Sequence, residues 1–318
     1  MPVMEQTLDT MRLFSGSSNP DLAEAIAGIL SIPLSKIELS KFSCGENYAR
    51  IGESIRGIDA YVIQSIGLNP NDDYMELFLI LDALKRASTK RVHVVLSHFG
   101  YARQDKKSAP REPISSRLIA DLMSAVGFDR LITVDLHSDQ IQGFFNQPVD
   151  HLTCLPLFVD YFKEKKLENL AVVAPDTGRA KFAKKLGDQL GADLVVLHKT
   201  RPQHNVAEIT NIVGDVEGKN LLIIDDMIDT AGSITSSVST LKKHGCKDIY
   251  VAATHPVFSG PAVERLSTAG FKEVVTTDSI YLPDSKQFDN LVQLSLAPML
   301  AEAIKRNQLH QSISSLFF

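Results

Sequence analysis

Short runs of β-branched and aliphatic residues recur along the chain, without the polar alternation of a half-exposed strand. Eight such runs lie at 61–64, 91–96, 130–134, 170–174, 194–197, 221–224, 249–254 and 273–277. Segments with helical periodicity separate most of them, at 20–30, 71–87, 117–127 and 180–191. Continuous apolar strands spaced by amphipathic helices are typical of parallel sheets that helices cover on both faces. The sequence therefore predicts an α/β fold.

The length of the chain points to two domains. At 318 residues it is about twice as long as a usual domain. Two prolines interrupt the pattern of strands and helices in the stretch QPVDHLTCLP, residues 147–156. We place the boundary there, at about residue 150. The predicted domains are 1–150 and 151–318, and the last residues of the chain can pack back on the first domain.

Composition and charge exclude several classes of protein. The net charge of -5 argues against a general role at nucleic acid or at a membrane surface, because both need a basic face. Glu5 and Asp9 stand where a signal peptide needs an apolar core, and no stretch approaches the ~20 apolar residues of a membrane span. Cys44, Cys154 and Cys246 have no metal-ligand spacing, so we expect thiols that pack in the interior. These features predict a cytoplasmic protein.

The stretch LLIIDDMIDTAGSI, residues 221–234, carries the clearest chemical signal. Four aliphatic residues lead into Asp225 and Asp226, and small or hydroxylated residues then open a predicted helix. Small residues let backbone N–H groups approach an anion closely, and the helix dipole favours negative charge at that end. This layout predicts a phosphate-binding loop, formed by Thr230, Ala231, Gly232 and Ser233.

Carboxylates beside a phosphate-binding loop need a different task, because they repel phosphate. Accepting hydrogen bonds from a sugar diol is one such task. Ribose 5-phosphate offers both a diol and a phosphate, so it fits the two halves of the motif. The alternative is that Asp225 and Asp226 form only a turn and a helix N-cap.

The same motif resembles a known family signature. Two hydrophobic residues, Asp-Asp, two further residues and then Asp-Thr-Ala-Gly-Ser resemble the 5-phosphoribosyl diphosphate (PRPP) signature of phosphoribosyltransferases and PRPP synthetases. A second loop, APDTGRAK at 174–181, resembles the diphosphate-side loop of the same proteins, although an ordinary helix start would look similar. It departs from them at Arg179, where synthetases often have glycine.

The N-terminal half distinguishes between these families. The stretch YARQDKKSAPREPIS, residues 101–115, places four basic side chains within nine residues of an acidic protein. Such local charge suits a polyphosphate, although a solvated surface loop is the alternative. YARQDKK and DLHSDQIQGFF (135–145) closely resemble ribose-phosphate diphosphokinases, also called PRPP synthetases. The resemblance extends from FSGSS (14–18) through FSCGENYARIGESIRG (42–57) to SISSLF (312–317).

This resemblance implies two phosphoribosyltransferase-like domains, each a mostly parallel sheet flanked by helices. It implies diphosphoryl transfer from Mg-ATP to the C1 hydroxyl of ribose 5-phosphate, giving PRPP and AMP, with Mg²⁺ as cofactor. Two alternatives stay open. One is a PRPP-using phosphoribosyltransferase, and the other is a non-catalytic regulatory homologue of the synthetases.

Residue roles follow from the resemblance. Arg103, Gln104 and Asp105 match positions along the ATP site, and Phe42 and Glu46 match positions that hold the adenine from a neighbouring subunit. Cys44 replaces the usual Asn or Asp, which puts one base contact in doubt. His137 and Asp176 match the magnesium-associated positions, and His137 can act through water because imidazole is an unusual ligand of Mg²⁺. Asp225 and Asp226 take the ribose hydroxyls, and residues 229–233 take the 5-phosphate.

The polar segment 198–215 contains Pro202 and is interpreted as a mobile excursion rather than a packed element. In the family it corresponds to the catalytic flexible loop, and Lys199 and Arg201 match its two basic positions. When such a loop closes, its positive charges stabilise the negative charge that develops in the transition state.

Assembly and regulation are also implied by the resemblance. Phosphate-activated members form hexamers or related homo-oligomers, and ADP inhibits them at a site between subunits. The positions in this chain that resemble the regulatory region are Ser54, Arg56, Ser312, Ser314 and Ser315.

Overall fold

The computed structural model describes residues 8–203 and 206–316, with the backbone alone at 199–203 and 206–210. The described chain forms two compact units. Unit 1 comprises residues 8–153, Ser279–Tyr281 and 295–316. Unit 2 comprises Cys154–Asp278 and Leu282–Leu294.

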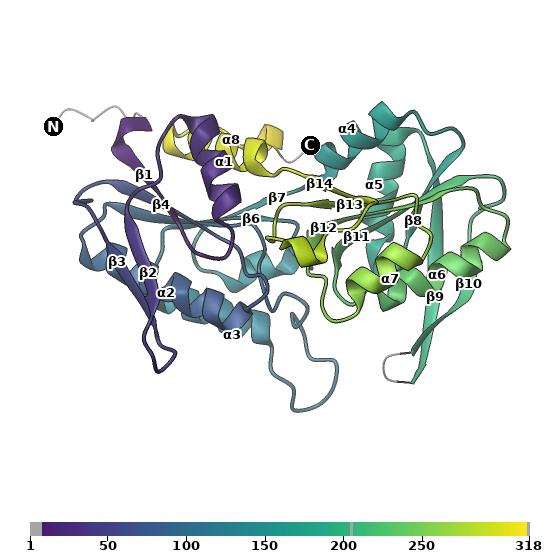
Figure 1. Cartoon of the computed structure of the whole chain (residues 1–318), viewed down its shortest axis with the longest axis horizontal. Coiled ribbons are helices and arrows are strands. Elements are labelled where there is room, and N and C mark those ends of the chain that lie inside the picture. Colours follow the sequence, from purple (N-terminus) through teal and green to yellow (C-terminus); the bar gives the residue numbers. More distant parts are fainter. Residues whose placement is uncertain (1–7, 204–205, 317–318) are drawn as a thin grey trace. The chain divides into compact units, whose positions relative to one another are not determined.

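Unit 1 is built on a five-stranded sheet in which all strand pairs are parallel. In spatial order its strands are β1 (Met11–Ser15), β4 (Asp59–Gln64), β5 (Arg91–Leu96), β6 (Arg130–Val134) and β7 (Val149–Leu152). Helices α1 (Pro20–Leu30) and α8 (Ala297–Gln308) cover one face, and α2 (Pro70–Arg86) and α3 (Ser115–Val126) cover the other (Figure 1). An antiparallel hairpin of β2 (Ile37–Lys41) and β3 (Asn47–Ile51) lies against α2.

Unit 2 is built on a seven-stranded sheet in the order β10-β9-β8-β11-β12-β13-β14. Its strands are β8 (Leu170–Ala174), β9 (Asp193–Gln203), β10 (Val206–Val213), β11 (Asn220–Ile228), β12 (Ile249–Pro256), β13 (Glu273–Thr277) and β14 (Leu291–Leu294). Only the β9–β10 pair is antiparallel among the described strands of this sheet. Helices α4 (Leu155–Lys165) and α5 (Ala180–Leu190) lie on one face, with α6 (Gly232–Lys243) and α7 (Ala262–Thr268) on the other (Figure 1).

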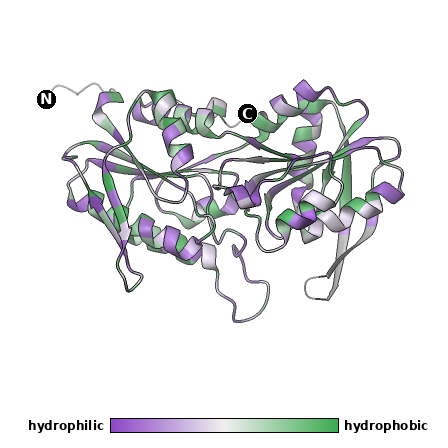
Figure 2. Cartoon of the chain, in the orientation of Figure 1, coloured by the Kyte–Doolittle hydropathy of each residue, from purple (hydrophilic) through white to green (hydrophobic). Residues whose placement is uncertain are grey.

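The central strands are apolar because helices cover both faces of each sheet. Every residue of β4 and β12 is buried. Figure 2 shows hydrophobic residues along the strands and alternating hydrophobic and hydrophilic residues around the helices. This burial on two sides explains the continuous apolar runs in the sequence, and it confirms the predicted α/β class.

The strand order of unit 2 reverses between β8 and β11. From β8 the chain passes through α5 to β9 on one side, and later returns to place β11 on the other side of β8. The loops after β8 and β11 therefore leave neighbouring strands at the same edge and diverge. In open α/β sheets such a reversal creates the crevice in which ligands bind.

Residues 198–215 were interpreted as an excursion without packed secondary structure, and this interpretation is wrong because the segment forms strands. The segment contains the end of β9 and the whole of β10, which pair as an antiparallel hairpin. Pairing between β9 and β8 stops at Val196, so the hairpin continues beyond the sheet. Ile209, Thr210, Ile212 and Val213 favour strand structure, and Pro202 is tolerated near the end of a strand that has no second neighbour there.

None of the helices within residues 8–203 and 206–316 combines the length and apolar character that a bilayer-crossing segment needs.

A buried polar network holds α8 against the sheet of unit 1. The Tyr61 hydroxyl accepts a hydrogen bond from Asn307 at 2.8 Å and donates one to Gln308 at 3.2 Å. Nearby, the Asp59 side chain is 1% exposed and accepts two hydrogen bonds from Arg91, at 3.0 and 2.7 Å. Burial alone would raise the pKa of Asp59, but the hydrogen bonds and charge of Arg91 bring it below its usual value.

Replacing Arg91 should destabilise unit 1. Arg91→Ala leaves a buried carboxylate without its counter-charge, which typically costs about 3–5 kcal/mol. Native-state hydrogen exchange of the β4 and β5 amides measures this local free energy. The control is Arg86→Ala, which breaks an exposed pair with Asp82 in the same unit. Equal losses of stability in the two variants would contradict the stabilising role of the Arg91–Asp59 pair.

The same pair predicts a pH dependence. Because the folded pKa of Asp59 is depressed, its contribution is present above the carboxyl's pKa in the unfolded chain. It is lost as pH falls through the folded value. The stability difference between wild type and Arg91→Ala should therefore shrink on acidification.

Candidate active site

The paired acids lie at the carboxyl end of β11, where this strand has run past its neighbour β8. Pairing with β8 ends at Ile223, whereas pairing with β12 continues to Ile228. The Asp225 side chain is 21% exposed and that of Asp226 is 4% exposed. The predicted sequence of apolar strand, acid pair and helix start is confirmed, except that the acids still belong to the strand.

Arg179 bridges the two acids. Its Nε lies 3.2 Å from Asp225 Oδ1, and its Nη2 lies 2.5 Å from Asp226 Oδ1. The arginine side chain is 18% exposed, so this contact is largely shielded from water. From the sequence, Arg179 was noted only as a departure from glycine, and its pairing was missed. The available signal was the acid pair itself, because adjacent buried carboxylates require a nearby cation.

The environment of Asp225 alters its acidity in two opposing directions. Burial raises the pKa of Asp225 well above its usual value, and the neighbouring Asp226 carboxylate raises it further. The Arg179 guanidinium lowers the same pKa. The pKa of Asp225 stays raised overall, so Arg179 offsets the effects of burial and of Asp226 only in part. Its charge acts toward the ionised carboxylate, which accepts hydrogen bonds without donating them.

The loop after β11 has the geometry of an anion-binding turn. Ala231 has φ 59° and ψ −2°, and α6 begins at the next residue, Gly232. Arg265 of α7 donates a hydrogen bond to the Thr230 carbonyl at 2.9 Å. A Cβ on Gly232 would lie 3.1 Å from Arg265 Nη1, so a larger residue would crowd this guanidinium. Backbone N–H groups at a helix start, with this cation beside them, suit a phosphate.

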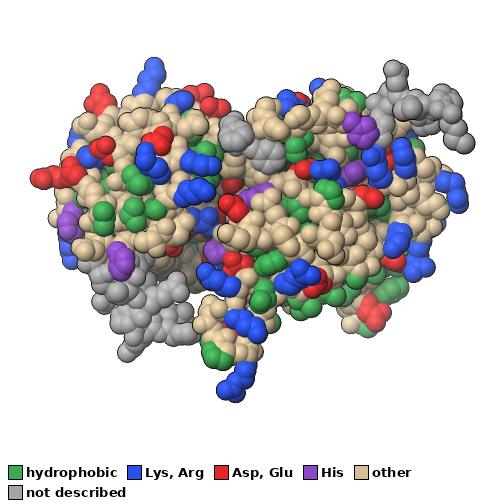
Figure 3. All heavy atoms as spheres, turned by 180° about the vertical axis from the view of Figure 1, so that it is seen from behind, with side chains coloured by type: hydrophobic (Ala, Val, Ile, Leu, Met, Phe, Trp, Pro, Cys, Tyr) green, Lys and Arg blue, Asp and Glu red, His purple; other side chains and the backbone are tan. Residues whose placement is uncertain are grey.

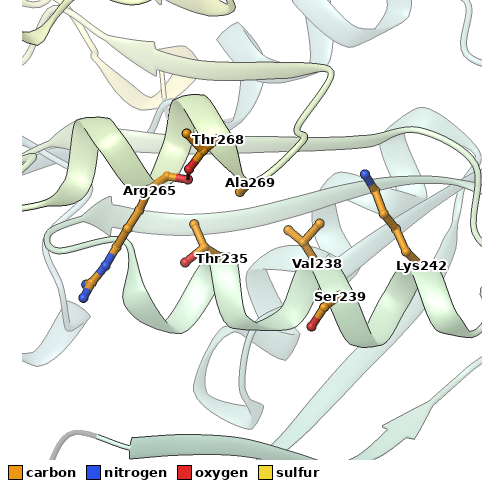
Figure 4. A pocket seen from close by; sticks show the side chains of 7 residues that line it. All are labelled: Thr235, Val238, Ser239, Lys242, Arg265, Thr268 and Ala269. Atoms are coloured by element: carbon orange, nitrogen blue, oxygen red, sulfur yellow. Dashed lines mark hydrogen bonds between the residues drawn. The ribbon is translucent and has the colours of Figure 1, made fainter.

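The position of Arg265 beside this loop was also missed in the sequence, because no local pattern connects it with Thr230. Figure 4 shows Arg265 at one end of a pocket between α6 and α7, with Lys242 at the other end. The pocket has a volume of about 410 Å³.

Thr230 and Ser233 of the predicted 5-phosphate loop are exposed, whereas Ala231 is buried and Asp229 is partly buried.

The two predicted metal-associated residues belong to different units. Asp176 follows β8 in unit 2, and its Oδ1 accepts a hydrogen bond from the Arg179 N–H at 3.1 Å. His137 follows β6 in unit 1. No group of three or more His, Cys, Asp or Glu side chains suited to a metal occurs in the part of the chain that the structure describes. A single carboxylate fits Mg²⁺ when waters and substrate phosphates complete its coordination.

The predicted ATP-side residues of YARQDKK lie on the loop between β5 and α3. Figure 3 shows Lys and Arg side chains on the projection at the bottom of that view, where this loop leaves unit 1. Arg103 and Gln104 are exposed, and Asp105 is partly exposed. The Gln104 carbonyl accepts hydrogen bonds from the Ser116 N–H at 3.3 Å and the Ser116 hydroxyl at 3.0 Å. The loop is therefore anchored at the start of α3.

Phe42 and Glu46 flank the turn of the β2–β3 hairpin. The Phe42 N–H donates to the Glu46 carbonyl at 2.9 Å, and Phe42 is 55% exposed. Cys44 lies in the same turn and is exposed, so the expectation of three interior thiols is wrong for it. A turn of this kind leaves the side chain pointing to solvent. Cys154 is buried, and Cys246 is partly buried.

The hairpin of β9 and β10 carries the two predicted catalytic residues. The backbone of Lys199 pairs with that of Ile209, beyond the last residue of β9 that pairs with β8. Arg201 lies further along the same strand. The side chains of Lys199 and Arg201 are outside the described part of the structure.

The predicted regulatory residues all belong to unit 1. Ser54 and Arg56 are exposed on either side of the buried Ile55. Near the C-terminus, Arg306 of α8 donates a hydrogen bond to the Ser312 carbonyl at 3.1 Å and another to the Ser315 hydroxyl. The Ser312 hydroxyl donates to that of Ser314 at 3.1 Å. Arg306 thus organises the terminal serines, and their regulatory role stays a prediction.

Comparisons with known proteins cover nearly the whole chain. Residues 11–127 match the N-terminal domain of ribose phosphate pyrophosphokinase, and residues 195–318 match the phosphoribosyl synthetase-associated domain. The chain is 48% identical over 307 residues to the ribose-phosphate pyrophosphokinase of Bacillus subtilis, covering 96% of this chain and 97% of the relative. Identity to the Corynebacterium ammoniagenes ribose-phosphate pyrophosphokinase is 47%, with the same coverage.

A solved structure agrees with this similarity. The crystal structure of phosphoribosylpyrophosphate synthetase from Mycobacterium smegmatis matches with a TM-score of 0.89 and 44% sequence identity. The match covers 94% of this chain and 98% of the other. The chain belongs to the ribose-phosphate pyrophosphokinase family.

Proposed function

We propose that this protein transfers the diphosphoryl group of Mg-ATP to the C1 hydroxyl of ribose 5-phosphate, giving PRPP and AMP. One observation supports the proposal above the others. At the edge where β8 and β11 diverge, an acid pair that can accept sugar hydroxyls lies next to a helix start that can bind a phosphate. Membership of the family over nearly the whole chain is consistent with this arrangement.

In this proposal, unit 2 binds the sugar phosphate. Asp225 and Asp226 accept hydrogen bonds from the ribose hydroxyls. The backbone and hydroxyl groups of residues 229–233 bind the 5-phosphate, which the α6 dipole and the Arg265 guanidinium stabilise.

Unit 1 binds the nucleotide. The exposed Arg103 pairs with the phosphates, beside Gln104 and Asp105 on the same loop. Phe42 and Glu46 hold the adenine of a neighbouring subunit, a role that suits an aromatic ring exposed at a hairpin turn.

The C1 oxygen attacks the β-phosphorus of ATP, and its proton is released to water. The bond from that phosphorus to the oxygen bridging it to the α-phosphate breaks, and AMP leaves with this oxygen. Such a transfer needs positioning and charge stabilisation more than a nucleophilic side chain. Lys199 and Arg201 on the β9–β10 hairpin supply positive charge as the transfer proceeds. Asp176 would serve as a ligand of Mg²⁺ and His137 would act through water, and the ion would supply neutralisation of phosphate charge.

We also propose that the protein works in the cytoplasm as a homo-oligomer, a hexamer, with inorganic phosphate as activator and ADP as inhibitor. The exposed Phe42 and the serine cluster around Arg306 are the surfaces that support subunit contact and anion binding.

The products of the reaction test the proposal. Incubation of the full-length protein with ATP, Mg²⁺ and ribose 5-phosphate should give AMP and PRPP in equal amounts. ADP as the only nucleotide product would indicate a plain kinase instead. A protein that makes neither product but binds an active synthetase would be the non-catalytic regulatory homologue.

Lys199→Ala should lower kcat by about 10²–10³-fold, because its contact strengthens as charge develops in the transition state. The KM for ATP should change little. Steady-state kinetics measure both, and Lys184→Ala is the control because it removes only an exposed pair with Asp188. A rise in KM that accounts for the whole loss of efficiency would make Lys199 a ground-state binding residue.

Inorganic phosphate should activate the enzyme, and Arg56→Ala should weaken that activation because it removes a cation from the predicted regulatory site. Initial rates across a phosphate titration, at fixed free Mg²⁺, measure the effect. A flat response of the wild-type enzyme would refute phosphate activation, and an unchanged response of the variant would exclude Arg56 from the site.

A further inference from the structure

Arg179 is placed to do more than initiate a helix. It is the last residue of a short 3-10 turn, Thr177–Arg179, between β8 and α5. Its backbone N–H donates to the Asp176 carboxylate at 3.1 Å. Its side chain reaches the acid pair at the end of β11, with contacts of 3.2 and 2.5 Å. One residue therefore connects the loop after β8 with both acids of the neighbouring strand.

The geometry of this contact is specific to a guanidinium. Two different nitrogens of Arg179, Nε and Nη2, each contact a different carboxylate. The planar fork of arginine fixes the spacing of its nitrogens, so the two carboxylates are held at a set separation. A lysine ammonium carries the same charge at a single point and cannot impose that spacing.

We propose that Arg179 is a positioning residue for ribose 5-phosphate, which holds Asp225 and Asp226 as a matched pair of acceptors for two adjacent sugar hydroxyls. The inference rests on the proposed function. It adds a residue to the sugar site that neither the acid-pair motif nor the phosphate loop contains.

Electrostatics explains why such a residue is needed. Asp225 and Asp226 are adjacent, largely buried and of like charge, so without a cation they repel each other. They would also repel the phosphate of the incoming sugar. A carboxylate has two oxygens and about four acceptor sites, so an acid that binds Arg179 can still accept from a hydroxyl. The guanidinium thus offsets the charge of the pair while leaving it able to bind the diol.

The test is ribose 5-phosphate binding to the full-length protein, measured by calorimetry without ATP, together with steady-state kinetics. Arg179→Ala should raise the Kd and KM for ribose 5-phosphate about tenfold or more, the size expected for loss of a charged hydrogen-bond partner. The KM for ATP should stay unchanged. Arg179→Lys should give an intermediate affinity, because it restores the charge without the fork.

A double-mutant cycle separates positioning from a general structural effect. Asp225→Asn should weaken ribose 5-phosphate binding by itself, and adding Arg179→Ala to it should cost less than Arg179→Ala costs in the wild type. Fully additive effects would overturn the proposal. Lys184→Ala, on α5 of the same unit, is the control and should leave the affinity unchanged.

Other outcomes also decide the question. Wild-type or tighter binding by a folded Arg179→Ala protein would show that the guanidinium is neutral or competes with the sugar, and would overturn the proposal. If Arg179→Ala does not fold, the Arg179→Lys variant decides the question. Wild-type affinity of that variant for ribose 5-phosphate would also overturn the proposal. A wild-type protein that fails to bind ribose 5-phosphate would overturn the proposed function as well.

Discussion

The parallel pairing of β8 and β11 is the constraint on which the candidate site depends. It places the loop that follows β8 beside the loop that follows β11, although the two are far apart in the sequence. The strand order reverses at this pair, so the loops diverge and leave an edge lined by backbone N–H groups and side chains. Because β11 runs on past the end of its β8 pairing, its two acids reach that edge as well.

Charge at this edge is balanced locally within an acidic protein. Asp225 and Asp226 would be costly to bury as a pair, and Arg179 supplies their counter-charge from the adjacent loop. Arg265 supplies positive charge at the Thr230 carbonyl, next to the start of α6. The edge can therefore present an acidic part to sugar hydroxyls and a basic part to a phosphate, as ribose 5-phosphate requires.

Much of the fold was predictable because its signals are local. The helix predicted at 20–30 is α1, and the strands predicted at 91–96, 130–134 and 170–174 have the bounds of β5, β6 and β8. The acid pair and the small residues after it were recognisable because strand, loop and helix start are contiguous. Periodicity and loop composition are sufficient for such features.

Features that depend on contacts between distant residues were not predictable in the same way. The β9–β10 hairpin was misinterpreted because polar composition and Pro202 resemble a loop, while its pairing forms only in three dimensions. The side chains that hold α8 against the sheet of unit 1, such as Tyr61 and Gln308, are buried partners that no local pattern connects. The Arg179 bridge was missed for the same reason, because it joins two loops that only the sheet brings together.

The central claim is that a pentose phosphate binds where β8 and β11 diverge. A crystal structure of the protein with ribose 5-phosphate tests it most directly. The account predicts that the sugar hydroxyls lie within hydrogen-bonding distance of Asp225 and Asp226, with the phosphate against the N–H groups at the start of α6. A sugar phosphate bound elsewhere, with this edge containing only solvent, would contradict it.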